Sequence, residues 1–397
     1  MIPELRKKYN SSFKQEVYEN FIRDLETFTY YPIDFRVSET PLFLTDEFTK
    51  KLYEASEDLL NQLNSEDFKQ KSENAVPKEL SAPNETPHPH FLCLDFAITK
   101  DDSGDFTPKL IELQGFPSLF SYQYYLDKIV RRHFEIPDGF SSFFNGLEGE
   151  NYIELLKKVI LGDKDPQQVI LMEIDPPHQK TRVDFACTEE LTGIKTVNLS
   201  DVIKRGKKLF YNNNGKEIPI ERIYNRVIFD EIQRKNFKFN FSFTDELDVE
   251  WAGHPNWFFK ISKYSLPSLK GKYVPRCYFL NELEKYPDDL DKFVLKPLFS
   301  FAGLGVEVDV TKDKLDKISD KSNYILQEKV EYAPVIETPD EYAKVEIRLM
   351  ILWDEKPILA TNLIRTSKGK MMGVDFNKNK TWVGSNLAYQ KSREGGL

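Results

Sequence analysis

The segment at residues 293–310, FVLKPLFSFAGLGVEVDV, limits most strongly what this chain can fold into. It places Lys296 late in an apolar strand, continues into a loop of small residues containing Gly303 and Gly305, and ends in a second apolar strand. Backbone N–H groups of such a loop can surround a polyanion while a lysine supplies positive charge. Glycine turns and strand lysines also occur in many other settings, so the segment indicates a phosphate clamp only in combination with further motifs later in the chain.

Two later segments extend the pattern toward a nucleotide. Residues 324–332, YILQEKVEY, run from an apolar strand into polar residues. A strand that turns polar at its end can place backbone groups against the edge of an adenine ring and side chains against a ribose. Residues 362–385 then add Arg365 in a strand that leads into a long polar loop.

Between these two segments, residues 344–353, KVEIRLMILW, alternate so that Glu346 and Arg348 share one face of a strand. A carboxylate and a guanidinium on one face can address the same ligand. The competing interpretation is a surface ion pair worth well under about 1 kcal/mol.

Residues 90–120 predict a hairpin of two apolar strands joined by a charged turn. If the hairpin is symmetric about residues 103–104, Asp95 lies directly opposite Glu112. Gln114 then lies two residues along on the same face, and any even shift of register keeps both carboxylates together.

Facing carboxylates normally destabilise a strand pair by roughly a few tenths of a kcal/mol, and a bound divalent cation would reverse the sign of that effect. Magnesium is commonly held by one or two carboxylates together with phosphate oxygens of a nucleotide. Asp95 and Glu112 therefore suit Mg-ATP better than a closed metal cage. The alternative places both acids on the solvent face of an ordinary hairpin.

Taken together, these segments resemble the ATP-grasp enzymes, in which two α+β lobes hold ATP between them. That family has an E-x-N strand that binds magnesium, and here the similar segment, Glu112-Leu113-Gln114, precedes the lysine and the glycine loop. This order resembles the circularly permuted members, glutathionylspermidine synthetase and eukaryotic glutathione synthetase. The chain departs from them at Cys93, where they have an arginine, and at Gln114, whose amide oxygen sits one methylene farther out than that of asparagine.

The resemblance implies a fold class and a set of site residues. The expected fold is α+β or α/β, a circularly permuted ATP-grasp with a Rossmann-like pre-ATP-grasp domain. The expected site comprises phosphate contacts from Lys263, Lys296, Ala302, Gly303, Leu304 and Gly305; adenine and ribose contacts from Gln327, Glu328, Lys329 and Val330; magnesium ligands Asp95, Glu112 and Gln114; and catalytic Arg348 and Arg365, with Glu346 orienting Arg348 or approaching the metal. Lys260 is the alternative to Lys263, and both could equally be solvated lysines.

The middle of the chain supports this fold. Residues 167–227 alternate strand, helix, strand, hairpin and strand, which argues for a parallel sheet. Arg226, at the end of the last strand, stands where the pre-ATP-grasp domain often presents an arginine to an acid substrate; a surface arginine is the competing interpretation. The predicted division of the chain is an N-terminal helical segment and loop at 1–85, large-lobe residues 86–150, a pre-ATP-grasp domain at 151–270, a small lobe at 271–335 and the remainder of the large lobe at 336–397.

The N-terminal part is the least informative. Residues 39–64 predict an amphipathic helix with a threonine N-cap. Residues 65–90 are polar and contain prolines, which predicts a long loop.

Composition agrees with a soluble enzyme without specifying which one. Acidic residues outnumber basic ones 64 to 55, which argues against a general nucleic-acid binder. The three cysteines never form a C-x-x-C pair, which indicates free thiols in a reducing compartment rather than a disulfide framework or zinc site. No run approaches about 18 apolar residues, so we expect no membrane association and a cytoplasmic location.

The implied function is ATP-dependent ligation of a small-molecule acid to an amine through an acyl phosphate, with ATP and Mg²⁺ as cofactors. Two alternatives remain open. One is a catalytically degenerate ATP-binding or scaffold protein, and the other is a small-molecule phosphotransferase. The acid, the amine and the oligomeric state do not follow from the sequence.

Overall fold

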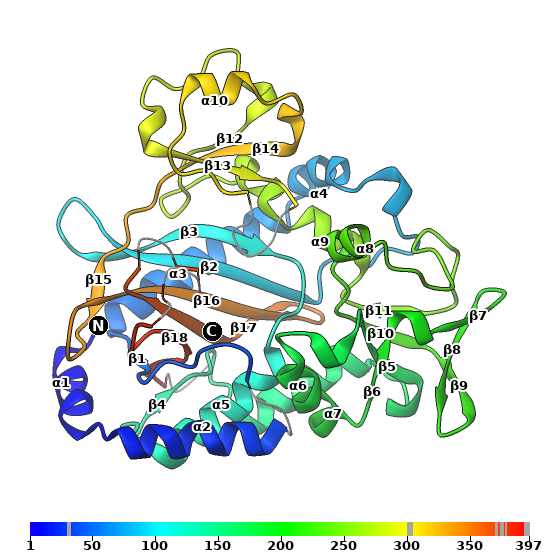
Figure 1. Cartoon of the computed structure of the whole chain (residues 1–397), viewed down its shortest axis with the longest axis horizontal. Coiled ribbons are helices and arrows are strands. Elements are labelled where there is room, and N and C mark those ends of the chain that lie inside the picture. The colour runs from blue at the N-terminus through cyan, green and yellow to red at the C-terminus, as the bar shows by residue number, and fades with distance from the viewer. Residues whose placement is uncertain (30–32, 300–304, 370–371, 374–376, 378, 393–397) are drawn as a thin grey trace.

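The computed structural model describes residues 1–29, 33–299, 305–369, 372–373, 377 and 379–392. Figure 1 shows a mixed α/β architecture with a central sheet, a parallel sheet beside it and a small sheet above it. The predicted loop residues Ala302, Gly303 and Leu304 lie outside the described residues, whereas Gly305 lies within them.

The central sheet is antiparallel and joins the predicted hairpin to strands from the end of the chain. Its strands, in spatial order, are β18 (Gly384–Asn386), β17 (Pro357–Ser367), β16 (Ala343–Trp353), β2 (Phe91–Lys100) and β3 (Phe106–Gln114), with β15 (Pro334–Ile336) paired to the start of β16. Segments about 250 residues apart in sequence, β2 and β16, are therefore direct neighbours.

Helices surround the sheets on both sides (Figure 1). Their bounds are α1 (Pro3–Ser12), α2 (Gln15–Thr29), α3 (Asp46–Leu63), α4 (Glu66–Ser72), α5 (Phe120–His133), α6 (Gly149–Leu161), α7 (Arg182–Thr192), α8 (Phe229–Lys235), α9 (Pro255–Lys260) and α10 (Lys312–Asp316). The Thr45 side chain accepts the Phe48 N–H and caps α3, as the sequence predicts. The loop predicted for residues 65–90 is partly wrong, because Ser65 caps α4 within it.

The two faces of the central sheet pack against different helices, since side chains alternate along each strand. Leu92 and Leu94 belong to a core shared with α3. Cys93 belongs to a core shared with α5 and α6, and Met350 on β16 faces the same way. Asp95 is the next residue on that second face, where the apolar core gives way to charged side chains.

The parallel sheet confirms the predicted alternation of strands and helices. Its order is β11 (Glu250–Ala252), β10 (Arg222–Asn225), β5 (Val169–Glu173) and β6 (Lys195–Asn198), all parallel. Helix α7 follows β5 in the chain and packs against α5. A separate antiparallel meander extends from this part of the molecule, formed by β7 (Ile203–Arg205), β8 (Lys208–Asn213) and β9 (Lys216–Ile220).

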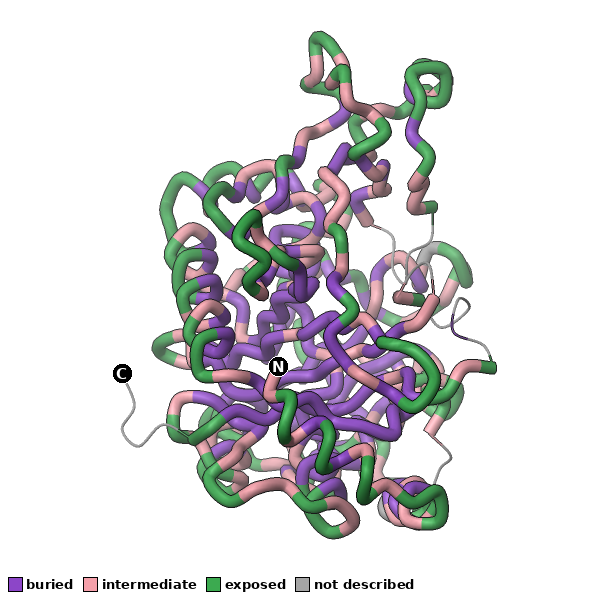
Figure 2. Tube along the Cα trace, turned by 90° about the vertical axis from the view of Figure 1, so that its left-hand side faces the viewer, coloured by how far each residue is buried: buried purple, intermediate pink, exposed green. Residues whose placement is uncertain are grey.

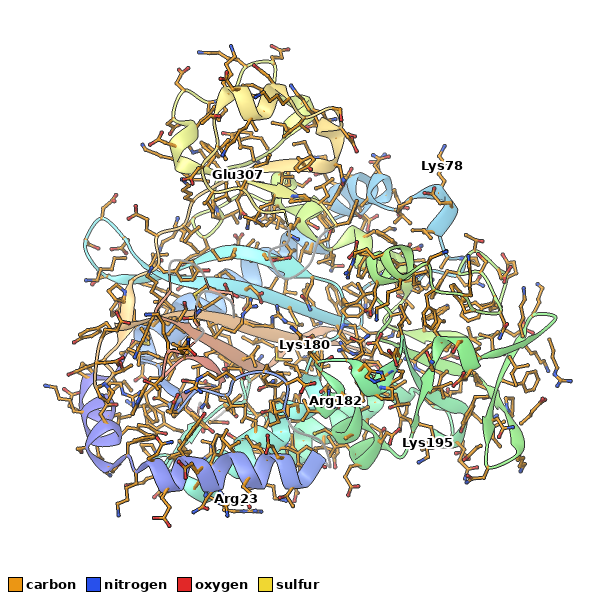
Figure 3. The ribbon with its side chains drawn as sticks, in the orientation of Figure 1. Arg23, Lys78, Lys180, Arg182, Lys195 and Glu307 are labelled. Atoms are coloured by element: carbon orange, nitrogen blue, oxygen red, sulfur yellow. The ribbon has the colours of Figure 1, made fainter. Side chains whose placement is uncertain are left out.

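The small sheet places β14 (Tyr324–Glu328) between β12 (Cys277–Phe279) and β13 (Phe293–Pro297), with antiparallel pairing on both sides. The second strand predicted after the glycine loop is wrong: in the described residues 305–310 there is only an isolated bridge between Glu307, labelled in Figure 3, and Leu295. Their backbones exchange two hydrogen bonds of 2.9 Å. The chain therefore touches the edge of β13 at one point and leaves it.

Figure 2 shows buried residues gathered in the interior and exposed residues along the outer helices and loops. One more small sheet is formed by β1 (Leu42–Phe43), β19 (Ala388–Lys391) and β4 (Phe140–Ser141), in that spatial order. Cys93, Cys187 and Cys277 are free and buried. Within the described residues, no helix combines the length and the apolar character that a membrane crossing requires.

Candidate functional site

A β-bulge sets the register of the two acidic residues on the predicted hairpin. Lys100 pairs with Phe106, so the turn is symmetric about Ser103 alone, and that register would place Asp95 opposite Ile111. A register shift between Asp95 and Phe96 corrects this and brings Asp95 opposite Glu112. The predicted pair is therefore confirmed, although the turn is one position away from the symmetric one.

The bulge also presents the Ile111 carbonyl to the small sheet. The Ile111 oxygen accepts hydrogen bonds of 3.3 Å from Lys296 Nζ and from Gln327 Nε2. Two predicted nucleotide contacts on neighbouring strands of the small sheet thus converge on one carbonyl of the central sheet. An extra residue in a bulge leaves its backbone groups free for such contacts.

Asp95 forms a bidentate ion pair with Arg348, its cross-strand neighbour. Arg348 Nε lies 2.6 Å from Oδ1 and Nη2 lies 2.7 Å from Oδ2. Asp95 is only 2% exposed, and burial by itself would raise the pKa of its carboxyl. The charges of Arg348 and Arg365 outweigh burial and leave that pKa below its ordinary value. Asp95 is therefore a buried, ionised group rather than an acid on a solvent face.

Arg365 connects the pair to Glu346. It contacts Asp95 Oδ2 at 3.1 Å and donates to Glu346 Oε1, which lies across the β16–β17 pair. Glu346 is 3% exposed, and its Oε2 accepts the Tyr332 hydroxyl at 2.8 Å. The surface ion-pair interpretation of Glu346 and Arg348 is wrong, because the Glu346 side chain is buried, the Arg348 side chain is only 13% exposed, and each is paired with a different partner.

Two lysines approach the same face from other segments. Lys263, at the start of the 3₁₀ turn Lys263–Ser268, lies 3.3 Å from Glu112 Oε1. Burial lowers the pKa of Lys296, and the charge of Glu112 partly offsets this. Lys260 points elsewhere, with Nζ 2.5 Å from Glu85 and a second contact to Glu73. These partners favour Lys263 over Lys260 as the lysine of the site.

The polar side chains at the end of β14 and just after it point to different places: some contact the site and others contact residues next to the other strands of the small sheet. Gln327 is buried against Ile111, and within the described chain its Oε1 has no hydrogen-bond partner. Glu328 instead binds Arg276, whose Nη2 lies 2.9 Å from Oε1. Lys329 Nζ donates to the Asp291 carbonyl at 2.5 Å. Of these three side chains, the one that contacts the central sheet beside the charged cluster is that of Gln327.

Gly305 has the backbone conformation that glycine allows. Its φ is 72°, and a Cβ there would lie 2.9 Å from Pro297 Cγ. The end of the glycine loop thus passes close to the end of β13, where Lys296 is located.

The predicted magnesium ligands fit a cation unequally. Both oxygens of Asp95 already accept guanidinium N–H groups. Glu112 is about one-third exposed and is contacted by Lys263, which is buried. Gln114 donates Nε2 to the Phe116 carbonyl at 3.2 Å, which leaves its Oε1 as the atom to meet a cation. Across the described ranges, no group of three or more His, Cys, Asp or Glu side chains is arranged to hold a metal ion.

Arg226 is buried, so its interpretation as a surface arginine is wrong. It is 3% exposed and lies between the rings of Phe116 and Phe185, with centroid distances of 5.2 and 5.4 Å. Its Nη2 donates to Thr181 Oγ1 at 3.1 Å, while Nε and Nη1 have no hydrogen-bond partner among the described residues. It follows β10 at the carboxyl edge of the parallel sheet, where such sheets commonly bind ligands.

Two further residues escape sequence reasoning. Tyr332 lies in a polar stretch without periodicity, so nothing in the sequence indicates that its hydroxyl reaches Glu346. Glu173 ends β5 beside Arg226, and burial raises the pKa of its carboxyl to about 8. Its position at the carboxyl end of a predicted parallel strand is a signal that could have identified it.

The comparisons with known proteins concern the fold. The sequence matches no family model and no curated protein. Among solved structures, the chain is similar to a glutathione synthetase-like effector from Globodera pallida in its apo form, with a TM-score of 0.58 and 10% sequence identity over 96% of this chain and 98% of that chain. At this identity the likeness shows a shared fold alone, and the circular permutation stays a prediction.

Proposed function

We propose that the chain binds ATP between the small sheet and the central sheet and uses it to join a carboxylic acid to an amine. The observation that carries the proposal is the charged cluster. Four cationic side chains from separate segments, Lys263, Lys296, Arg348 and Arg365, surround three carboxylates, Asp95, Glu112 and Glu346. The excess of positive charge, in a cluster that runs from buried Asp95, Glu346 and Lys263 to partly exposed Glu112 and Arg365, favours a polyanion. Buried Arg365 Nε, which has no hydrogen-bond partner in the described chain, is a donor left for it.

The resemblance to ATP-grasp enzymes and the fold shared with the glutathione synthetase-like effector support the same proposal. Lys263, Lys296 and the loop from Ala302 to Gly305 would bind the phosphates. Residues 327–330 would hold adenine and ribose, with Gln327 closest to the charged cluster. Phosphoryl transfer needs positioning and charge neutralisation more than covalent help from the protein.

Asp95, Glu112 and Gln114 remain the predicted magnesium ligands, and Glu112 and Gln114 fit that role. Bound with ATP, Mg²⁺ would neutralise charge on the phosphate oxygens. Asp95 would have to exchange guanidinium donors for the ion, and this gives it the weakest fit of the three.

The acid substrate would lie toward the parallel sheet. Arg226 offers two unpaired N–H donors there, which suits a carboxylate. The γ-phosphoryl group of ATP would pass to a carboxylate oxygen, releasing ADP and giving an acyl phosphate, and the amine nitrogen would then displace phosphate to form the amide. No thiol is needed: burial raises the pKa of Cys93 to about 12, so this cysteine stays protonated.

A second candidate is an ATP-binding protein whose ligase chemistry has been lost. It is favoured by Cys93, which is fully buried where the resembled enzymes place an arginine, and by the pairing of Asp95 with two arginines. Such a protein binds ATP without acid-dependent turnover.

Hydroxylamine trapping separates these candidates. With Mg-ATP, hydroxylamine and a panel of amino acids and short peptides as carboxylic acids, the ligase proposal predicts ADP release coupled to hydroxamate formation for at least one acid. Lys296→Ala should abolish both, whereas exposed Lys317→Ala should retain both. ATP binding with neither product would favour the degenerate protein, and ADP release without hydroxamate would contradict an acyl phosphate.

A further inference from the structure

Both carboxylate oxygens of Asp95 accept hydrogen bonds from arginines, whereas a metal ligand needs an oxygen that is free to bind the ion. Three N–H groups from Arg348 and Arg365 reach its two oxygens at 2.6 to 3.1 Å. The β2–β16 register places Asp95 opposite Arg348, so the backbone itself holds this pair together. Arginine cannot lose its proton in a protein, and both guanidinium groups therefore stay charged.

A divalent cation at Asp95 would meet two positive charges in direct contact with the same carboxylate. Coulomb repulsion between a doubly charged ion and a guanidinium is twice that between two unit charges at the same distance. The ion would also remove the principal acceptor of Arg348, whose side chain is only 13% exposed. The geometry therefore disfavours Asp95 as a metal ligand.

Glu112 has a different environment on the neighbouring strand. Its side chain is about one-third exposed, and among the described residues its ion-pair partner is Lys263, 3.3 Å away, with the charge of Lys296 also near it. A lysine is a point charge on a flexible stem and can turn toward a phosphate when a cation arrives. Gln114 lies two residues along β3 and can add an amide oxygen.

Asp95 helps to hold the guanidinium of Arg365 in place. Nη2 of Arg365 is anchored by Asp95 and Glu346, while its buried Nε has no hydrogen-bond partner among the described residues. The anchors fix the plane of the guanidinium and leave this donor for an incoming anion.

We infer that Asp95 is a positioning residue that orients Arg348 and Arg365 toward the phosphates, and that the divalent cation of this site depends on Glu112. The inference rests on the proposed ATP site. It assigns to Asp95 an indirect role through the arginines and makes Glu112 the carboxylate that sets the metal dependence.

The test is the affinity for ATP with Mg²⁺ and with EDTA, measured by calorimetry for wild type, Asp95→Asn, Glu112→Gln and, as a control at the exposed hairpin tip, Asp102→Asn. Glu112→Gln should lose the gain from Mg²⁺ and bind metal-free ATP at least as tightly as wild type, because it removes a negative charge beside Lys263. Asp95→Asn should weaken binding about tenfold under both conditions, so the ratio stays at the wild-type value. Simple removal of a negative charge would instead tighten metal-free binding.

Loss of the Mg²⁺ gain in Asp95→Asn, with metal-free affinity retained, would overturn the inference and leave the ATP site standing. If Asp95→Asn does not fold, the double variant Asp95→Asn/Arg348→Gln, in which both partners are neutral (the neutral pair), is used in the same comparison. Electron paramagnetic resonance of Mn²⁺-ATP gives a second readout, since the spectrum should change in Glu112→Gln and not in the Asp95 variants.

Absence of ATP binding by wild type would overturn the proposed function. The melting temperatures of the ligand-free proteins then test separately whether Asp95 anchors the two arginines. Anchoring predicts that Asp95→Asn melts below wild type and that the neutral pair regains part of the loss. Equal melting of Asp95→Asn and wild type would overturn it.

Discussion

Tyr332 donates its hydroxyl to Glu346 Oε2 at 2.8 Å, and this hydrogen bond ties the segment that leaves the small sheet to the charged face of the central sheet. Three residues separate Tyr332 from the end of β14, and Glu346 is one of the two carboxylates that hold Arg365. If the small sheet moves when the proposed nucleotide binds, this hydroxyl is one route by which the movement reaches Glu346 and Arg365.

Removal of that hydroxyl should destabilise the protein. Tyr332→Phe leaves a buried carboxylate oxygen without its donor, and hydrogen bonds to charged groups contribute about 1.5–3 kcal/mol. Urea unfolding should show a loss in this range, whereas Tyr342→Phe, at a residue that is 55% exposed, should show none. Equal stability of the two variants would mean that the hydrogen bond contributes nothing.

Substitution of Lys260 should lower the free energy of unfolding, whereas substitution of Lys263 should lower the affinity for ATP. Lys260→Met removes the buried partner of Glu73 and Glu85 and should cost roughly 2–3 kcal/mol of unfolding free energy, less than a fully buried pair because Glu73 remains largely exposed. Its ATP affinity should be that of wild type. Lys263→Met should weaken ATP binding about tenfold or more and change stability little. The reverse assignment of the two effects would identify Lys260 as the lysine of the site.

Glu173 should make stability fall with rising pH. Its folded pKa, about 8, lies above the ordinary value of 4.5. The folded state therefore holds the proton more tightly, and this contribution is fully present below pH 4.5 and lost as pH rises through 8. Glu173→Gln should remove this fall in unfolding free energy with pH. Above pH 8 it should stabilise the protein by about a few kcal/mol, because each unit of pKa shift corresponds to about 1.4 kcal/mol. Parallel pH profiles of the two proteins would contradict the prediction.

Gly115 should not tolerate a side chain. A Cβ there would lie 2.6 Å from the Trp257 carbonyl oxygen and 2.9 Å from Ile261 Cβ, and its N–H bonds to the Ile261 carbonyl at 2.8 Å. Gly115→Ala should cost about 1–3 kcal/mol or more and move the end of β3, with Glu112, away from Lys263. Gly104→Ala has open space around it and should cost about 1–2 kcal/mol through its positive φ alone, without a change in ATP affinity.

The sequence could predict the features that local pattern determines. The cap at Thr45, the parallel sheet and the shared face of Glu346 and Arg348 all follow from periodicity and turn chemistry. The prediction that Asp95 faces Glu112 is correct only because the bulge at Ile111 compensates for a turn that is one position away from the predicted one.

The remaining features depend on contacts between distant segments. Asp95 and Arg348 are 253 residues apart, so their pairing is invisible to local pattern. The choice between Lys260 and Lys263 likewise depends on which carboxylates the fold brings near each lysine. Helix α4 was missed because its seven mostly polar residues show no apolar periodicity.

The central claim is that the cluster around Lys296 is an ATP site, and thermal stabilisation by Mg-ATP tests it most directly. A ligand at 100 times its dissociation constant stabilises a protein by about 2.7 kcal/mol, which is readily visible as a shift in melting temperature. We predict this shift for wild type and for Lys317→Ala, and its loss in Lys296→Ala. A shift that survives in Lys296→Ala, or no shift in wild type, would contradict the claim.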